Sequence, residues 1–502
     1  MRISLLVLPG GTPDQVARTA ASLRSARHVE LLVRRQDVRT DGQRSPALRQ
    51  RARLVESADA SPAGFLRAAL TAATGEFVAV LAPGDELEPG VLGAVDAYLR
   101  ARPRVDVLYT DEQWQASGAD GIRIKPDWDP TYLEATGYLG RLCLVRRSVA
   151  VQAGGFRDGF AGAEEWDLHL RVTALTDRVE HVPVIGVTRI APPDAGPDVV
   201  ASALRAVEDR YRRADVPARV EPVDGTGYLR IWREIPDPPL VTVVIPTVGA
   251  TRTVRGEDAV VLERCLASLV SRTTYARWEV VLVTSPGTPE ATLGRAREIL
   301  GDRLRAVAPV EGDFSFSVSV NEGVRHATGS LVLLLNDDTE VIEPRWLDRM
   351  VAVAQDPTVG VVGAKLLFED DTVQHVGIVH GDDWFPVHVH RAEPDGTGRF
   401  GSMVVDMRHL AVTAACMLTR RALFEEVGGF TRDLPLAFND VDYCYKVVAA
   451  GHAVVCTPFA RLYHYESSSR VGEVRDFERQ YLLDHTVAFA GRDPHVDWRS
   501  IP

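Results

Sequence analysis

Acidic and amide side chains follow an apolar run in the second half of the chain. Asn336, Asp337 and Asp338 come directly after Leu331 to Leu335. Carboxylate oxygens are preferred ligands of Mg²⁺ and Mn²⁺, which keep coordination positions free for phosphate. The cluster is therefore suited to holding a divalent cation, although a solvated turn after a strand would contain the same residue types.

Two later groups have the chemistry of a catalytic site. Asn439, Asp440 and Asp442 stand at the start of a predicted helix, where a carboxylate either takes a proton from a hydroxyl group or caps the helix. His464 follows another apolar run and is either a ligand or a hydrogen-bonded core histidine. Each group alone favours the structural interpretation, whereas their joint occurrence in one half of the chain favours a site.

Short β-branched runs alternate with helical stretches around these groups. The pattern predicts strands at Val241 to Ile245, Glu279 to Val283 and Leu331 to Leu335, and a helix at Leu262 to Ser271. Near-continuous apolar strands separated by helices indicate an α/β fold with mostly parallel sheets covered on both faces. Ligands bind at the carboxyl ends of such strands, so the polar groups above are expected at one edge of the sheet.

The two halves of the chain resemble each other. Ala73 to Pro89 parallels Ala327 to Pro344, with a turn, a buried strand and an acidic loop in the same order. Arg146 to Val172 parallels Arg420 to Val447, with matching Arg-Arg and Gly-Gly-Phe pairs before an acidic helix. Two matches in the same order predict duplicated domains.

A proline-rich stretch lies between the two copies. Prolines in Pro222 to Pro239 can neither donate to a strand ladder nor continue a helix. At 502 residues the chain is also too long for one ordinary core. We therefore predict two domains, residues 1–235 and 236–502, with the boundary near Ile235.

Composition narrows the class of protein. Apolar residues make up 45% and charged residues 25%, as in folded soluble proteins. The formal charge is −12 and no dense basic run occurs, which argues against a nucleic-acid partner. The apolar runs are far shorter than the roughly 20 residues of a transmembrane helix. The N-terminus lacks signal-peptide features, and the five cysteines form no C-x-x-C pair. We predict a cytoplasmic protein with reduced thiols and no structural zinc.

Seven segments in order resemble one family. They read "VTVVIPT", "CLASLVSRTTYARWEVVLV", "FSFSVSVNEGVRHATG", "NDD", "AACMLTRRALFEEVGGF", "FNDVDY" and "LYHYESSSR", within Leu240 to Arg470. As a set they resemble the family 2 glycosyltransferases, nucleotide-sugar enzymes with the GT-A fold. The resemblance implies two tandem GT-A domains, of which the second is catalytic.

The resemblance also assigns expected roles. Asp338, helped by Asp337, and His464 would hold the Mg²⁺ or Mn²⁺ that bridges the donor diphosphate, and Asp440 would be the base. Lining of the nucleotide-sugar pocket is implied for Pro246, Thr247, Thr284, Asn321, Asn336 and Asp337. Lining of the sugar or acceptor pocket is implied for Gln374, His375, Asn439 and Asp442.

The expected reaction is direct displacement with inversion. A bound cation neutralises the charge that develops on the departing diphosphate, and a carboxylate accepts the proton of the attacking hydroxyl. The resemblance implies a nucleotide-sugar donor and a glycan or lipid-linked acceptor in cell-surface polysaccharide biosynthesis. Because such acceptors are often lipid-linked, peripheral contact with the inner face of the plasma membrane is left open.

One position departs from the family pattern. Relatives carry an aspartate at the end of the second strand, where this chain has Thr284 in "VLVTSPG". A hydroxyl can hydrogen-bond but supplies no charge. Extra residues in "VGATRTVRGED" also follow the first strand. The identity of the nucleotide is therefore not predicted.

The first half lacks most of the corresponding residues. Ala82 to Gly84 stand where the second half has its metal loop, and no histidine occurs near Thr188. Arg34 or Arg35 stands where relatives place the nucleotide-binding aspartate, while Glu165 occupies the position of the base. The segment "KPDWDPTYLEATGYLGRLCLVRR" resembles the first domains of tandem bacterial surface-polysaccharide and rhamnosyl transferases. We predict a non-catalytic domain that packs on the active one or guides the acceptor.

Three alternatives stay open. The first half is a second active site if Asp85, Asp111 and Glu165 act together. The whole chain is a carbohydrate-binding scaffold if the second site is also inactive. Sugar-phosphate nucleotidyl transfer would need a Gly-rich phosphate loop with a basic residue after the first strand, which "IPTVGATRTVRGED" does not supply convincingly.

Overall fold

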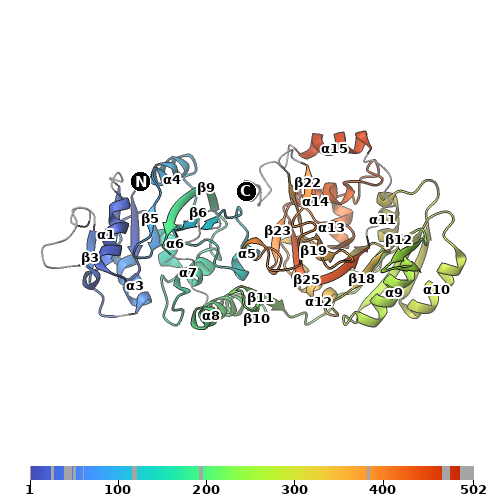
Figure 1. The fold of residues 1–502 in the computed structure, drawn as a ribbon, viewed down its shortest axis with the longest axis horizontal. Coiled ribbons are helices and arrows are strands. Elements are labelled where there is room, and N and C mark those ends of the chain that lie inside the picture. The colour runs from blue at the N-terminus through green and yellow to red at the C-terminus, as the bar shows by residue number, and fades with distance from the viewer. Residues whose placement is uncertain are drawn as a thin grey trace. The chain divides into compact units, whose positions relative to one another are not determined.

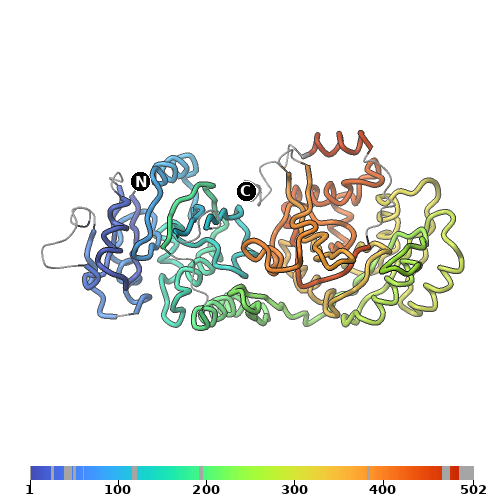
Figure 2. The backbone as a smooth tube through the Cα atoms, in the orientation of Figure 1, coloured from blue at the N-terminus to red at the C-terminus, as the bar shows by residue number. Residues whose placement is uncertain are grey.

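The computed structural model describes residues 2–23, 28–38, 48, 52–59, 61–115, 121–190, 196–381, 385–465 and 475–486. The chain divides between Ile231 and Trp232 into two compact units, where the sequence prediction placed the boundary at Ile235. This division falls within β11 (Leu229–Arg233), the second strand of a hairpin with β10 (Ala218–Pro222) that follows α8 (Pro197–Arg213); Figure 2 shows the backbone passing between the units there.

The second unit is built around one large sheet (Figure 1). The strands of the whole unit, including two small hairpins outside this sheet, are β12 (Val241–Thr247), β13 (Thr251–Val254), β14 (Glu257–Val260), β15 (Trp278–Thr284), β16 (Leu304–Pro309), β17 (Leu331–Leu335), β18 (Thr339–Val341), β19 (Val359–Leu367), β20 (Val373–His375), β21 (Ile378–His380), β22 (Pro386–His388), β23 (Met407–His409), β24 (Cys416–Arg420) and β25 (Ala453–His464). Its helices are α9 (Val261–Arg272), α10 (Glu290–Leu300), α11 (Phe316–Arg325), α12 (Trp346–Ala354), α13 (Arg421–Glu426), α14 (Asn439–Ala449) and α15 (Asp476–Thr486).

The main sheet of the second unit has the order β16-β15-β12-β17-β24-β19-β25-β18. The first four strands are parallel, β24 runs antiparallel to both of its neighbours, and β25 is parallel to β19. β20 pairs with β19, and β13–β14 and β21–β22 form separate hairpins. The carboxyl ends of β12, β15 and β17 thus meet at one edge, as expected for parallel strands.

Helices cover both faces of this sheet. Every residue of β12 and β17 is buried. Alternate side chains point to opposite faces: Val243 packs in the core under α9, α10 and α12, whereas Val244 packs with α11, α13 and α14. This two-sided burial explains the continuous apolar runs, and it confirms the predicted strands and the helix starting at Leu262.

The first unit contains a second large sheet. Its strands are β1 (Ile3–Val7), β2 (Val29–Arg34), β3 (Ala52–Val55), β4 (Phe77–Leu81), β5 (Glu86–Leu87), β6 (Val107–Trp114), β7 (Ile122–Arg123), β8 (Leu144–Arg146) and β9 (Val179–Arg189), followed by the hairpin β10 (Ala218–Pro222) and β11 (Leu229–Arg233). Its helices are α1 (Pro13–Ser22), α3 (Pro62–Ala72), α4 (Val91–Ala101), α5 (Pro130–Ala135), α6 (Arg147–Gln152), α7 (Glu164–Val172) and α8 (Pro197–Arg213).

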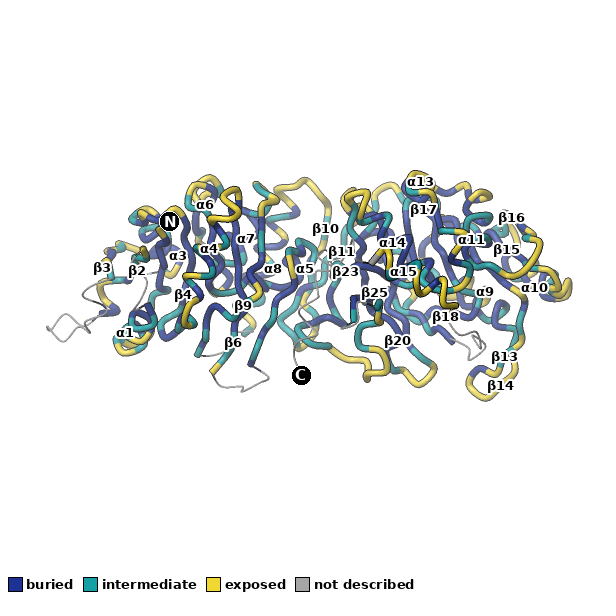
Figure 3. The backbone as a smooth tube through the Cα atoms, turned by 90° about the horizontal axis from the view of Figure 1, so that it is seen from above, coloured by how far each residue is buried: buried dark blue, intermediate teal, exposed yellow. Residues whose placement is uncertain are grey.

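The two main sheets have the same topology. The first unit orders its strands β3-β2-β1-β4-β8-β6-β9-β5, which matches the second unit strand for strand along the chain. The directions match as well, with β8 antiparallel to β4 and β6, and β9 parallel to β6. Buried residues run through the interior of each unit, while exposed residues gather in loops and on outer helix faces (Figure 3). The predicted α/β fold class is confirmed.

Candidate functional site

A cavity of about 190 Å³ opens in the second unit beyond the carboxyl end of β17. A cavity needs only about 10–15 Å³ by this measure to hold one water molecule, so this one admits a larger ligand. Five of the predicted site residues line it, namely Asn336, Gln374, Asn439, Asp440 and His464. Residues separated by more than a hundred positions in the sequence thus meet in one place.

Asp338 and His464 converge because β18 pairs with β25. Thr339 lies opposite His464 in this antiparallel pair, and the Tyr465 amide donates to the Asp338 carbonyl at 2.9 Å. The side chains meet with Asp338 Oδ1 3.1 Å from His464 Nε2. Asn336 Nδ2 lies 3.1 Å from the same ring nitrogen.

Gln374 fixes the orientation of the His464 ring. Its Nε2 donates to the His464 carbonyl at 3.2 Å, so its Oε1, 2.6 Å from His464 Nδ1, accepts a hydrogen bond from that nitrogen. In a neutral ring the lone pair of Nε2 then faces Asp338 Oδ1. A second-shell partner of this kind commonly sets the tautomer of a metal-binding histidine.

The two carboxylates of the loop have different electrostatics. Burial and the neighbouring Asp338 raise the pKa of Asp337 to about 7, although the Thr247 hydroxyl, which donates to Asp337 Oδ2 at 2.6 Å, opposes the shift. Burial would also raise the pKa of Asp338, but its interactions with His464 and Arg252 and a backbone hydrogen bond together hold that pKa below its ordinary value. Asp338 is therefore the carboxylate that is ionised at neutral pH.

The donor atoms at this point fit a divalent cation. Asp338 Oδ1 and Asn336 Oδ1 are buried without a hydrogen-bond partner. Asp338 Oδ1 lies 3.1 Å from His464 Nε2, and it is the Asn336 amide nitrogen that lies beside the same ring nitrogen. Oxygen and imidazole ligands suit Mg²⁺ and Mn²⁺. Within the described residues no group of three or more His, Cys, Asp or Glu side chains is arranged around one metal position.

Asp440 faces the same cavity from the first turn of α14. Its Oδ2 accepts from the Ala414 amide at 3.2 Å and its Oδ1 from the Val441 amide at 2.9 Å. The preceding Phe438 adopts a left-handed conformation with φ of 58°, which turns the chain into the helix. The carboxylate is thus oriented by backbone groups and is half-buried at the cavity wall.

Pro246, Thr247 and Thr284 lie at neighbouring strand ends. Thr247 pairs in register with Thr284, and Pro246 with Val283, on the parallel strands β12 and β15. Thr247 links this edge to the acidic loop through its bond to Asp337. The predicted nucleotide residues of the first two strands are therefore adjacent to the carboxylates.

Eight predicted residues are not among those that line the cavity: the strand-end and loop residues Pro246, Thr247, Thr284, Asp337 and Asp338, and three more distant ones. Asn321 uses both ends of its amide on the Phe430 backbone, at 2.8 and 2.9 Å. Asp442 is buried and bonded to Thr431 and Lys446. His375 is buried behind the wall. The contacts of Asn321 and Asp442 join parts of the chain to each other, so these two residues support the fold.

Sequence reasoning did not find three other lining residues, His388, Arg391 and Thr413. His388 ends β22, and its Nδ1 lies 2.9 Å from Nδ1 of His375. The histidine-rich string "FPVHVHR" was the available signal, but nothing in the sequence shows which of its two histidines faces a cavity.

Comparisons with known proteins identify one family and two curated relatives. The family described as "Glycosyltransferase like family 2" matches residues 238–482. The uncharacterized protein y4gI of Sinorhizobium fredii is 34% identical over 419 residues, covering 80% of this chain and 45% of its own length. The O-antigen biosynthesis protein RfbC of Myxococcus xanthus is 34% identical over 448 residues, covering 86% and 34%. The chain thus spans less than half the length of these curated relatives.

Solved structures with weak overall similarity include two glycosyltransferases. The mannosyltransferase PcManGT from Pyrobaculum calidifontis, in complex with GDP-Man and Mn²⁺, is 21% identical with a TM-score of 0.36 over 59% of this chain and 75% of its own. GalNAc-T7 with UDP, GalNAc and Mn²⁺ is 17% identical with a TM-score of 0.37 over 51% of each chain.

In the part of the chain that the structure describes, no helix has the length and apolar character needed to cross a membrane. The family match over residues 238–482 confirms the predicted family for the second unit. The second unit of this chain, over residues 238–482, is a family 2 glycosyltransferase domain.

Proposed function

We propose that the second unit transfers a hexosyl group from a nucleotide sugar to an acceptor hydroxyl, with inversion and with Mg²⁺ or Mn²⁺. The observation that carries this proposal is the 3.1 Å approach of Asp338 and His464 at a cavity that Asp440 also lines. A cation site and a base beside one cavity are the two parts that the reaction requires.

Asp338 and His464 would hold the cation, and Asn336 offers a further oxygen beside them. The cation would neutralise charge on the departing diphosphate. Gln374 keeps the Nε2 lone pair of His464 directed at this position. Thr247 and Thr284, at the ends of β12 and β15, would line the nucleotide side together with Pro246 and Asp337.

Asp440 would accept the proton of the attacking hydroxyl. Two backbone amides hold its carboxylate in place, so little reorganisation is needed when the proton is transferred. Because Asp440 and His464 line the same cavity, an acceptor hydroxyl beside Asp440 would lie close to the donor held at the cation. Direct displacement of this kind inverts the anomeric configuration.

We propose cell-surface polysaccharide biosynthesis as the setting, with a glycan or lipid-linked acceptor. Support comes from the relative named for O-antigen biosynthesis. A cytoplasmic location, with peripheral contact at the inner face of the plasma membrane, would bring the site to a lipid-linked acceptor. The first unit would be a non-catalytic domain, because Arg141 pairs with Glu165 where the second unit has its base.

The test is a donor screen on the full chain. Release of nucleoside diphosphate from a panel of nucleotide sugars would be measured with Mn²⁺ and with a chelator. We expect turnover with at least one donor, lost on chelation. Asp338→Asn and His464→Ala would each lower it by at least about 100-fold, because each removes a ligand of the charge-neutralising cation. Asp302→Asn, at an exposed carboxylate, is the matched control and would retain activity.

Calorimetry with Mn²⁺ and the nucleotide sugars separates this function from its rival. A wild-type chain that neither turns over nor binds any donor with Mn²⁺ would contradict sugar transfer and favour a carbohydrate-binding scaffold. Wild-type turnover that survives chelation would contradict the proposed role of the cation.

A further inference from the structure

A carboxylate on α15 holds the loop that leads into α14. Glu478 is 1% exposed, and its Oε1 accepts hydrogen bonds from the Leu436 and Ala437 amides at 3.0 Å each. No other acceptor for these two amides lies among the described residues. One side chain of α15 therefore fixes the backbone of two consecutive loop residues.

The same loop residues form part of the cavity wall. Leu436, Ala437 and Phe438 line the cavity, and Asn439 and Asp440 follow them at the start of α14. Phe438 has the left-handed conformation that turns the loop into the helix. A bulky residue pays a free-energy cost for this conformation and keeps it only where the surroundings hold it in place. The two amides that bind α15 immediately precede this residue.

α11 holds the beginning of the loop. The Phe316 amide donates to the Pro435 carbonyl at 2.8 Å, and the Ser317 hydroxyl donates to the Leu434 carbonyl. These bonds from α11 end at Pro435, and the next two amides bind to α15. The two helices thus hold successive parts of the loop, and the part held by α15 is the one nearer to the base.

Glu478 stands on the inner face of α15. Leu482, one turn later on the same face, packs in the core that also contains Val441 and Tyr445 of α14. Phe477, next to Glu478 in the chain, is exposed. A buried carboxylate costs free energy unless it is hydrogen-bonded, and the two loop amides supply the hydrogen bonds of Glu478. The packing of the helix therefore directs this carboxylate at the loop.

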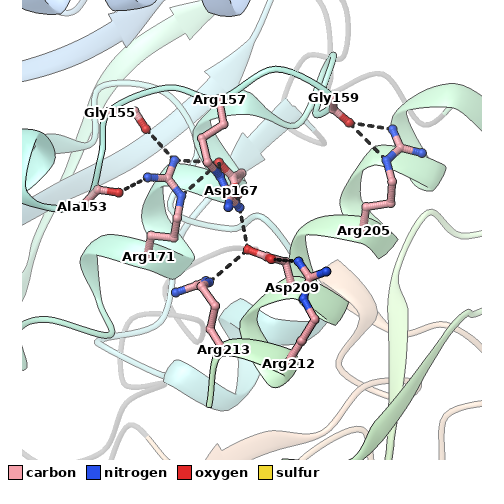
Figure 4. A network of polar contacts seen from close by, with 10 residues as sticks. All are labelled: Ala153, Gly155, Arg157, Gly159, Asp167, Arg171, Arg205, Asp209, Arg212 and Arg213. Carbon is pink, nitrogen blue, oxygen red and sulfur yellow. Dashed lines mark hydrogen bonds and ion pairs between the residues drawn. The ribbon is translucent and has the colours of Figure 1, made fainter. Parts of the chain in front are cut away.

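The first unit holds the corresponding loop with a different group. Arg205 on α8, the described helix after β9, donates to the Gly159 carbonyl from Nη2 at 2.8 Å and from Nε at 3.1 Å (Figure 4). Gly159 lies in the loop before α7, the acidic helix of this unit. The helix after the last long strand thus binds the loop before the acidic helix in both units, through a cation in the first and a carboxylate in the second.

We infer that Glu478 is a positioning residue for the base. By holding the Leu436 and Ala437 amides, it sets the backbone from which Asp440 reaches the cavity. The inference rests on the proposed sugar transfer and gives α15 a part in it. The proposed cation residues lie on other elements, at the pairing of β18 with β25, so their positions do not depend on this loop.

Steady-state kinetics on the full chain test the positioning role. Glu478→Ala removes the acceptor and should lower kcat about 100-fold, as when a catalytic group is misplaced by about 1 Å. The KM for the donor should stay within about threefold, because the cation residues are unchanged. Glu478→Gln keeps an acceptor oxygen at the same reach and should stay within about threefold of the wild-type kcat.

Asp484→Ala, at an exposed carboxylate of the same helix, is the matched control and should retain kcat. A wild-type kcat in Glu478→Ala, or equal losses in the alanine and glutamine variants, would overturn the proposal.

A double variant separates positioning of the base from general support of the fold. If Glu478 acts through Asp440, adding Glu478→Ala to Asp440→Asn should lower kcat by no more than a further threefold or so, because the base is already lost. A further loss of about 100-fold in the Asp440→Asn background would contradict the inference, since Glu478 would then support catalysis by another route.

Amide hydrogen exchange of the full chain without substrate keeps the test independent of turnover. We expect slow exchange of the Leu436 and Ala437 amides in wild type and in Glu478→Gln, and fast exchange in Glu478→Ala. Equal exchange in wild type and Glu478→Ala would overturn the proposal. If no nucleotide sugar is turned over but Glu478→Ala speeds exchange of these amides, the proposed function fails, whereas the role of Glu478 in holding the loop is supported.

Discussion

The two units share one strand order but differ in the residue at the end of the strand that pairs with the acidic loop, β25 in the second unit and β9 in the first. In the second unit, Glu340 pairs with Tyr463, and His464 follows beside Asp338. In the first unit, the equivalent Glu86 pairs with Thr188, so the counterpart of His464 is the next residue, Arg189. A guanidinium therefore replaces an imidazole, and the first unit has a fixed positive charge at the position where the second unit has the proposed cation ligand His464.

A second arginine of the first unit, Arg141, stands at the position that corresponds to a cavity-lining residue of the second unit. The matching Arg-Arg pairs at the ends of β8 and β24 align Arg141 with Ala415, which lines the cavity of the second unit. Arg141 pairs with Glu165 and lies 3.6 Å from Asp85. Asp85 and Glu165 are thus joined by an internal cation, which argues against the alternative of a second active site.

The remaining member of that alternative site is used elsewhere. Asp111 Oδ1 accepts from the Lys125 amide at 2.8 Å and lies 2.9 Å from His181 Nε2. Next to it, Glu112 lies 3.4 Å from Lys125 Nζ and 3.1 Å from Arg189 Nη1. Burial would raise the pKa of Glu112, but Lys125 and Arg189 hold it at about 2. The charges of this region are satisfied within the chain.

The anchoring of the acidic helix is similar in both units. In the first, Asp167 on α7 pairs with Arg171 one turn later and with Arg157 (Figure 4). In the second, Asp442 on α14 pairs with Lys446 one turn later. The ion pairs that anchor the helix are thus present in both units, whereas the groups at its first turn and at the strand ends differ.

The largest expected difference between the units concerns the base. Asp440→Asn should lower kcat by about 100- to 10,000-fold, the range for loss of a general base. Glu165→Gln, at the matched position of the first unit, should leave kcat within about twofold, because Glu165 already pairs with Arg141. Equal losses in both variants would show that the first unit takes part in catalysis. Donor turnover and circular dichroism of both variants are the measurements.

Removing the internal cation should affect stability instead. Arg141→Ala leaves Asp85 and Glu165 without their partner, and we expect the first unit to lose about 3 kcal/mol, as when one member of a buried ion pair is removed. The control, Arg67→Ala, breaks exposed pairs and should cost at most about 1 kcal/mol. Denaturant unfolding reports both. An Arg141→Ala variant as stable as wild type would remove the argument that this cation closes the first site.

The smallest expected effect concerns Mn²⁺ affinity and the imidazole of His464, which the first unit replaces with Arg189. Gln374→Leu removes the partner of His464 Nδ1 and should weaken Mn²⁺ affinity about 10- to 100-fold, as for other second-shell ligands. Gln480→Leu, at an exposed position of α15, should leave the affinity unchanged. Calorimetric titration with Mn²⁺ gives the comparison, and unaltered affinity in Gln374→Leu would contradict a metal-binding role for His464.

Much of the fold was predictable because it follows local patterns. The run Leu331–Leu335 is a strand with the predicted bounds, and α9 exceeds its predicted limits by one residue at each end. The pattern also identified Asp338, Asp440 and His464 as groups at strand ends and a helix start. It did not identify His388 as a cavity-lining residue, because the shape of a cavity depends on the tertiary structure.

The amino-acid sequence by itself determined the elements, the duplication and the family, because these depend on residue types at fixed spacing. Only the tertiary structure decided which side chains meet. Asn336 and His464 are 128 positions apart and touch because β18 pairs with β25. Arg141, in the turn before β8, pairs with Glu165 on α7 because the fold brings these two segments together. Contacts of this kind depend on strand order and side-chain direction, which spacing along the chain does not contain.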